Sequence, residues 1–134
     1  MRRQSREIAL QVLFQLEFAP QISIQQLLNL FEDSIDEASI SYAEELITGV
    51  MSNKSVIDDK IQSLSRNWKL DRMAAVDRNV LRFAAYELLF SKNPLSPGIV
   101  IDEAIEIAKK FGTTDSGSFV NGILDQMAKE SGKK

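Results

Sequence analysis

Apolar residues recur along this chain with the three- and four-residue spacing of α-helices, and short polar connections separate the apolar segments. No pair of segments has the pattern of paired strands. Short connections indicate helices that pack against their neighbours, so the expected fold is an all-α, compact bundle of six to seven helices formed by residues 1–134. The predicted helices cover residues 3–18, 24–32, 41–51, 56–65, 73–90, 97–111 and 116–129.

Local signals mark several of these helix starts. Ser23 with Gln26, and Ser41 with Glu44, have the spacing of a capping box. In this motif each residue satisfies a free backbone N–H group near the other. Ser55 is placed to cap the helix that follows it.

The first predicted helix carries two apolar stripes. One stripe includes Val12 and Leu16, and the neighbouring stripe places Leu10, Phe14 and Phe18 at every fourth position. A single surface helix needs only one stripe, about 100° wide. The second stripe is therefore either buried in a multi-helix core or exposed for a protein partner.

An arginine cluster opens the same helix. Arg2, Arg3 and Arg6 are three and four residues apart and share one helical face. Guanidinium groups are planar forks of donors that suit phosphate and base-edge recognition. The alternative is a solvated basic terminus, although a helix N-terminus normally favours anions.

The segment 73–90 is the expected core helix. Arg82 and Glu87 fall away from its apolar side and are interpreted as solvated charges. Asp77 lies among apolar neighbours, so we expect it to cap backbone N–H groups or to pair with an arginine. Trp68 precedes this helix in a connection, where we expect its ring to fill the core.

The loop at 112–117 joins the last two predicted helices. Its two glycines are not a P-loop, because no lysine follows the second glycine and no parallel sheet precedes the loop. The helix start after the loop offers free backbone donors, and Asp115 is placed to cap them. Phe119 belongs either to the core or to a stacking platform for an unpaired base.

Composition narrows the function further. The chain has 134 residues, a formal net charge of -3, and neither cysteine nor histidine. These absences remove disulfides, the thiolate nucleophile, the commonest general base and the commonest metal ligands, which disfavours an enzyme or a metalloprotein. No apolar run is long enough to span a bilayer and no signal-peptide pattern is present, so the cytoplasm is the expected compartment.

Three segments resemble one known family when taken together. They read RRQSREIALQVLFQLEF, DRMAAVDRNVLRFAAYELLF and IVIDEAIEIAKKFGTTDSGSFVNGILD. Their wording, order and spacing are similar to those of the NusB family of bacterial transcription antitermination factors. The resemblance implies two packed helical subdomains, no catalytic activity and no cofactor. It also implies binding to the boxA element of nascent ribosomal RNA leaders together with NusE, a small-subunit ribosomal protein, in an antitermination complex on RNA polymerase.

The resemblance also assigns residues to two surfaces. The RNA side would be Arg2, Arg3, Arg6, Asp115 and Phe119. The NusE side would be Phe14, Phe18, Arg82 and Glu87.

Three positions depart from the family pattern. Gln4 stands where many members have a basic residue, Phe14 replaces a common tyrosine, and Asp102 replaces the usual asparagine. The first change and the net acidity indicate modest, salt-sensitive affinity for RNA alone, because few phosphates can be neutralised.

Other interpretations remain open. The chain could be a purely protein-interacting bundle, or a module related to the one that precedes some ribosomal RNA cytosine methyltransferases. The second would require a catalytic domain that is absent from these 134 residues. The second apolar stripe could also serve a homodimer.

Overall fold

The computed structural model describes residues 2–91 and 95–132, which contain seven α-helices, one short 3₁₀ helix and no strand. The predicted all-α class is confirmed. The elements are α1 (Arg2–Phe18), α2 (Ile24–Asn29), α3 (Glu37–Ser52), α4 (Lys54–Leu64), η1 (Leu70–Arg72), α5 (Ala75–Leu89), α6 (Pro97–Phe111) and α7 (Ser116–Glu130). Within the described ranges, no helix is both long and apolar enough to cross a membrane.

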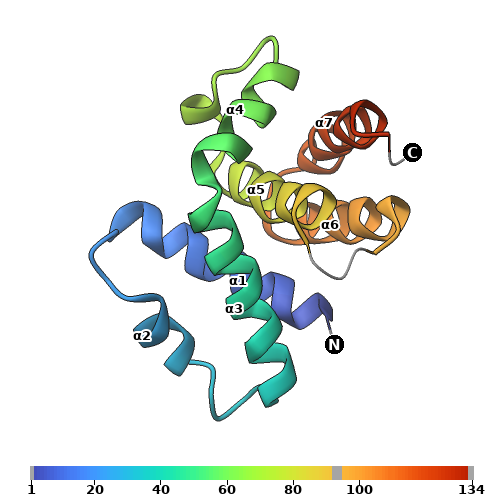
Figure 1. The fold of residues 1–134 in the computed structure, drawn as a ribbon. Helices are drawn as coiled ribbons and strands as arrows, with labels where there is room; N and C mark the ends of the chain where they lie inside the picture. The colour runs from blue at the N-terminus through green and yellow to red at the C-terminus, as the bar shows by residue number, and fades with distance from the viewer. Residues whose placement is uncertain (1, 92–94, 133–134) are drawn as a thin grey trace.

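Helix α5 is the centre of the bundle (Figure 1). On one side of α5, helices α1, α2 and α3 pack together. On the other side, α4 and α6 each pack against α7. Helix α5 contacts α1 and α3 from the first group and α4, α6 and α7 from the second. The two groups correspond to the two packed subdomains that the resemblance implies, and α5 joins them.

Burial on α5 extends around its whole circumference. Every residue from Asn79 to Leu88 is buried, including Arg82 and Glu87. The interpretation of these two charges as solvated is therefore wrong. A helix surrounded by five others has no solvent-facing side along this stretch, so its polar residues must find partners inside the protein.

A close helix crossing depends on a glycine. Helix α3 passes α5 at Gly49, where an added Cβ atom would collide with the ring of Tyr86. The Tyr86 hydroxyl donates to Glu45 Oε2 on the same helix, 3.2 Å away, which holds the ring across α3. The Tyr86 ring can lie this close to the α3 backbone only because position 49 has no side chain.

The helix starts bear out one capping prediction and overturn two. Ser23 and Gln26 form the expected capping box at α2. Helix α3 begins about one turn earlier than predicted, because Asp36 accepts hydrogen bonds from the backbone N–H and hydroxyl of Ser39 at 3.1 and 2.8 Å. Helix α4 starts before Ser55, directly from the end of α3, and has no side-chain cap.

Trp68 does not fill the core. Its side chain lies at the surface, with the residue 57% exposed, in the connection between α4 and η1. The backbone carbonyl of Trp68 accepts hydrogen bonds from Gln62 Nε2 and Ser65 Oγ, both at 2.9 Å. These bonds fix the backbone of the connection and leave the indole outside the bundle.

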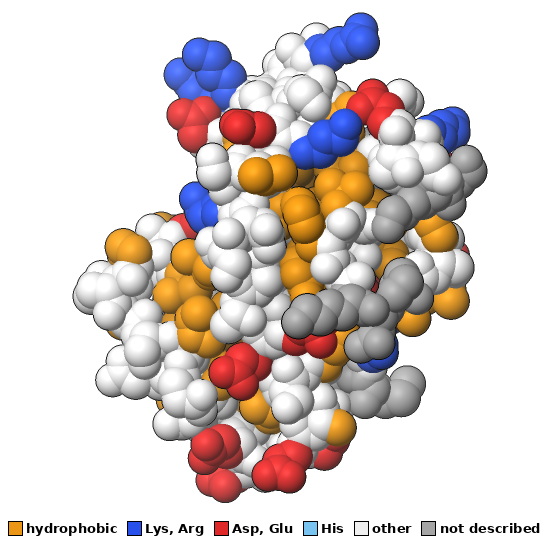
Figure 2. Space-filling view, in the orientation of Figure 1, with side chains coloured by type: hydrophobic (Ala, Val, Ile, Leu, Met, Phe, Trp, Pro, Cys, Tyr) orange, Lys and Arg blue, Asp and Glu red, His pale blue; other side chains and the backbone are white. Residues whose placement is uncertain are grey.

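Charge is segregated on the surface. Acidic side chains gather at the end of the molecule formed by the α2–α3 connection and the start of α3 (Figure 2). A nucleic acid would be repelled there, so the acidic end is excluded as an RNA surface.

We expect Gly49→Ala to lower the free energy of unfolding by about 1–3 kcal/mol, because the new methyl group must displace the Tyr86 ring. Urea denaturation monitored by circular dichroism measures the change. Gly122→Ala is the matched control at an exposed position of α7, with open space around the new Cβ atom, and should stabilise by about 0.5–1 kcal/mol. Equal effects at the two glycines would contradict the close crossing.

Candidate nucleic-acid and partner-protein surfaces

Two of the three N-terminal arginines reach the surface. Arg2 is exposed, and its guanidinium carbon lies 4.3 Å from the centre of the Tyr42 ring. Arg3 donates through Nε and Nη2 to the two carboxylate oxygens of Glu103 at 2.6 and 2.7 Å, and its side chain remains 41% exposed. Both side chains keep donors available to an external anion, since each guanidinium has five N–H groups.

Arg6 lies inside the protein instead. Its Nε and Nη2 donate to the two carboxylate oxygens of Glu87 on α5, both at 2.7 Å, and the two side chains are 3% and 2% exposed. Glu103 lies 3.7 Å from Nη1 of the same guanidinium. Burial lowers the pKa of Arg6, but the hydrogen bonds and charge of Glu87 outweigh burial and raise it overall. Arg6 therefore stays charged and joins α1 to α5.

Tyr42 completes this buried cluster from α3. Burial raises the pKa of its hydroxyl to about 12, and the negative charge of Glu87 adds to the rise. The phenol therefore remains protonated at neutral pH and can donate a hydrogen bond. The Tyr42 ring also contacts the Arg2 guanidinium, so Tyr42 lies between the exposed Arg2 and the buried Arg6–Glu87 pair.

Helices α1 and α6 run parallel, and ion pairs between them place their charged side chains in rows along the surface. Arg3 pairs with Glu103, and Lys110 Nζ, two turns further along α6, lies 3.1 Å from Glu7, which is one turn further along α1. The arginine end of α1 therefore lies beside the middle of α6. The loop at 112–115 comes after the end of α6, about 15 Å further along the helix axis from Glu103.

The α6–α7 loop is tightened by side-chain contacts. Ser116 Oγ accepts from the backbone N–H of Thr113 at 2.9 Å. An added Cβ atom at Gly112 would collide with Ser116 Oγ and approach the carbonyl of Ala108 at 2.7 Å. Asp115 occupies the N-cap position of α7, as predicted, but its side chain makes no capping hydrogen bond and is exposed.

Phe119 is half-buried at the edge of a pocket of about 320 Å³. The pocket lies between the connection before α5, the first turn of α5 and the start of α7. Asp115 lines the same pocket, so the structure brings these two predicted residues together. Trp68 and Asp77 also line it.

Phe14 faces a second, mostly apolar groove of about 430 Å³. The groove runs between α1 and α2 and reaches the start of α5 and the end of α6; its lining includes Leu30, Phe31, Val76 and Phe111. The second apolar stripe of α1 is thus divided: Leu10 is buried, Phe14 is half-buried and Phe18 is 72% exposed. The Phe14 and Phe18 ring centres lie 5.0 Å apart, so the exposed ring extends the apolar surface.

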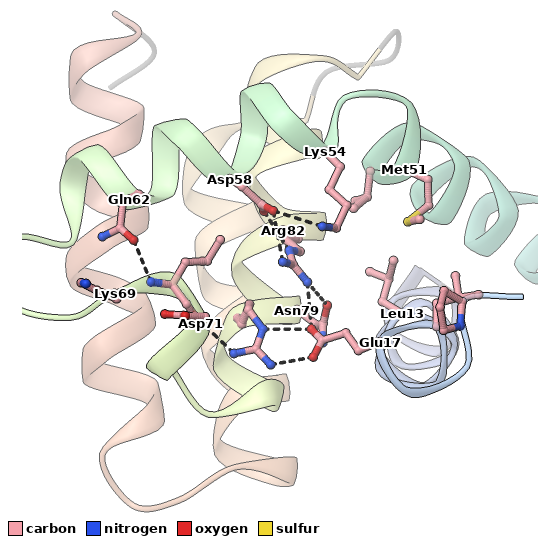
Figure 3. Close-up of a pocket in the computed structure, with 15 residues that line it drawn as sticks. Leu13, Glu17, Met51, Lys54, Asp58, Gln62, Lys69, Asp71, Asn79 and Arg82 are labelled. Atoms are coloured by element: carbon pink, nitrogen blue, oxygen red, sulfur yellow. Dashed lines mark hydrogen bonds and ion pairs between the residues drawn. The ribbon is translucent and has the colours of Figure 1, made fainter.

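Arg82 belongs to an ionic network at the end of α1 opposite Arg6 (Figure 3). Its guanidinium donates to Asp58 on α4 at 2.8 and 3.1 Å and to Glu17 on α1 at 2.8 Å. Arg78 donates to both Glu17 oxygens at 2.6 and 2.9 Å. Burial raises the pKa of Glu17, but the hydrogen bonds from Arg78 and Asn79 outweigh burial and hold the pKa below its ordinary value.

Arg82 and Glu87 are therefore inside the molecule, at 6% and 3% exposure, and present no surface to a partner protein. Both connect α1 to α5. Sequence reasoning missed their partners, because Asp58 and Glu17, which pair with Arg82, and Arg6, which pairs with Glu87, lie on other helices and no local spacing relates them. One signal in the sequence could have indicated their burial: Arg82 and Glu87 are charged residues within the long apolar pattern of α5.

Within the described part of the chain, these features define a class of protein. It is a helical bundle that offers an apolar groove beside a surface with exposed arginines and aromatic rings, which is typical of a protein that binds both a protein and a nucleic acid. Residues 3–129 match the model of the NusB family. The chain belongs to the NusB family.

Full-length relatives agree with this assignment. The chain is 61% identical over 128 residues to the transcription antitermination protein NusB of Bdellovibrio bacteriovorus, a match that covers 96% of this chain and 95% of that protein. It is 48% identical to the NusB of Desulfitobacterium hafniense, over 99% and 91% of the two chains.

Solved structures share the fold. A structure of T. maritima NusB superposes with a TM-score of 0.89 at 46% identity, covering 97% of this chain and 92% of that one. A crystal structure of the antitermination factors NusB and NusE in complex with double-stranded RNA contains a chain with a TM-score of 0.82 at 27% identity, covering 96% of both chains.

We expect Glu87→Gln to lower the free energy of unfolding by about 3 kcal/mol, because it leaves the Arg6 guanidinium charged and buried. Replacing both partners, with Arg6→Met and Glu87→Leu together, should cost less than Glu87→Gln alone. Urea denaturation of the three variants gives the comparison. A double variant that is less stable than Glu87→Gln would show that the pair itself, and not the unpaired charge, dominates.

The depressed pKa of Glu17 predicts how stability depends on pH. A carboxyl group with a lowered folded-state pKa stabilises the fold fully above its ordinary value of 4.5 and loses that contribution as the pH falls through the folded value. We expect Glu17→Gln to cost about 2 kcal/mol at neutral pH and progressively less below pH 4.5. Denaturation curves at several pH values test this prediction. The control is Glu106→Gln, which removes an exposed ion pair with Lys109. A pH-independent cost would contradict the ionic role.

Proposed function

We propose that this protein is a transcription antitermination factor that binds boxA-type RNA of nascent ribosomal RNA leaders together with NusE. It acts as a non-catalytic adaptor on RNA polymerase. It is located in the cytoplasm, where bacterial ribosomal RNA is transcribed. The observation that carries this proposal is the adjacency of the two surfaces. Val76 lines the apolar groove and the next residue, Asp77, lines the aromatic pocket, so the two sites meet at the first turn of α5.

The RNA follows α1 and α6 in this proposal. It begins at Arg2 and Arg3, passes the exposed Lys110 and reaches Asp115 and Phe119 beyond the end of α6. A path of about 15 Å along α6 suits a few nucleotides of single strand. Arg6 contributes by holding α1 in place, since its buried guanidinium is hydrogen-bonded to Glu87 and lies 3.7 Å from Glu103.

NusE occupies the apolar groove. Phe14, Leu30, Phe31 and Phe111 line it, with Leu30 highly exposed. The exposed ring of Phe18 lies beside the groove, in contact with Phe14. Aromatic side chains are enriched at the centres of protein interfaces, because they bury a large apolar area at low entropic cost. Arg82 and Glu87 stabilise the helices behind this face.

One observation favours a second candidate function. Arg3 and Arg6 are already paired with carboxylates of the chain, as in a bundle that binds only proteins. Under this alternative the arginines serve the fold, and RNA affinity does not depend on them.

RNA binding by variants separates the two functions. We expect Arg2→Ala and Arg3→Ala each to weaken binding to a fluorescein-labelled boxA RNA several-fold and to reduce the slope of log affinity against log salt by about 1. Fluorescence anisotropy across a salt series, with and without NusE, measures both. Lys129→Ala, at the far end of α7, is the matched control and should bind like the unaltered protein.

Phe14→Ala completes the test, because it should weaken the gain in RNA affinity that NusE provides and leave binding to RNA alone unchanged. Unaltered affinity and salt slope in both arginine variants, with thermal stability intact, would favour the protein-interaction bundle.

A further inference from the structure

The pocket at Phe119 contains groups that neither the composition nor the family resemblance brought to the RNA surface. Trp68 comes from the connection before η1, Arg72 from the end of η1 and Asp77 from the first turn of α5. They join Asp115 and Phe119 around a volume of about 320 Å³. This volume is open to one flat, planar group of the size of a nucleobase.

Two aromatic rings line this pocket. Trp68 is 57% exposed and Phe119 is half-buried. The exposure of Trp68 is unfavourable by itself, because removing a large indole from water lowers the free energy. No other ring is in the lining. Exposed aromatic rings beside a basic surface are the usual stacking platforms for unpaired bases.

Asp77 supplies a hydrogen-bond acceptor that lacks a donor. The residue is 9% exposed, and within the described ranges its Oδ1 atom is buried without any hydrogen-bond partner. A buried carboxylate oxygen in this state is costly. Since Asp77 lines the pocket, rotation of its side chain can turn this oxygen toward an N–H donor bound there.

The rest of the lining favours a phosphate at the rim. Helices α5 and α7 both begin at this pocket, with Ala74 and Asp115 as N-cap residues, and neither start has a side-chain cap hydrogen bond. Free backbone N–H groups and the exposed cation of Arg72 attract an anion, whereas the exposed carboxylate of Asp115 at the α7 start repels one, so the Arg72 side of the rim is the favourable position.

We propose that this pocket holds one unpaired nucleotide of the bound RNA, with its base stacked on Trp68 and Phe119 and its N–H edge on Asp77. Guanine fits best, because its imino and amino groups are neighbouring donors to a carboxylate. Uracil fits worst, because its single N–H lies between two carbonyl oxygens that a carboxylate repels. This inference rests on the proposed function and names Trp68 and Asp77 as base-contacting residues of the same RNA surface.

Trp68 provides its own reporter, because it is the only tryptophan in the sequence. The experiment titrates the protein with labelled boxA RNA and records tryptophan emission and RNA anisotropy on the same samples. We expect the emission to be quenched with the same midpoint as the anisotropy change. Trp68→Leu should weaken binding about tenfold, whereas Trp68→Phe keeps a stacking ring and should lose less.

Phe90→Leu is the matched control, because Phe90 is a partly exposed aromatic residue at the opposite end of α5. It should leave both the affinity and the Trp68 quenching unchanged. Circular dichroism melts confirm that each variant is folded.

Base identity gives an independent readout. In a series of RNAs with each guanine replaced in turn by uracil, one replacement should weaken binding about tenfold in the unaltered protein. That penalty should largely disappear in Asp77→Asn, since the neutral amide both donates and accepts.

The possible failures are distinguishable. An absent anisotropy change would refute RNA binding itself, and with it the proposed function. Normal RNA binding with unchanged Trp68 emission and a full-affinity Trp68→Leu variant would refute the nucleotide pocket alone. Quenching by NusE without RNA, and not by RNA, would make the pocket a protein-docking site and would equally overturn the inference.

Discussion

The buried ion pair between Arg6 and Glu87 fixes how α1 lies on α5, and the other surfaces depend on that position. Two charges that are almost completely removed from water must remain paired, because either one alone would be strongly destabilising. At the opposite end of α1, Glu17 is held by Arg78 and Arg82 of α5. The two clamps allow one antiparallel register of α1 against α5, with the apolar residues of α1 buried between them.

This register determines what α1 presents to solvent. It brings Arg2 over Tyr42, places Arg3 against Glu103 on α6, and leaves Phe14 facing the groove beside α2. The arginine cluster thus has two roles that its sequence does not separate. The inner member, Arg6, maintains the fold, and the outer members, Arg2 and Arg3, face solvent.

The first turn of α5 links the apolar groove to the aromatic pocket. Val76 faces one and Asp77 the other, so a protein in the groove and an RNA strand in the pocket would lie in contact with adjacent residues. In the proposed complex, such proximity would let each partner add surface for the other and so compensate for the few phosphates that the exposed arginines can neutralise.

The sequence by itself determined the helices, because apolar spacing and capping signals such as Ser23 with Gln26 act over a few residues. It also determined the family, through motifs that extend along the whole chain. It did not determine which side chains are exposed. Trp68 lies outside, and Arg82 and Glu87 lie inside, because burial depends on how many helices surround a segment. Only the tertiary structure could separate the structural arginine at position 6 from its exposed neighbours, since its partner is 81 residues away in the chain.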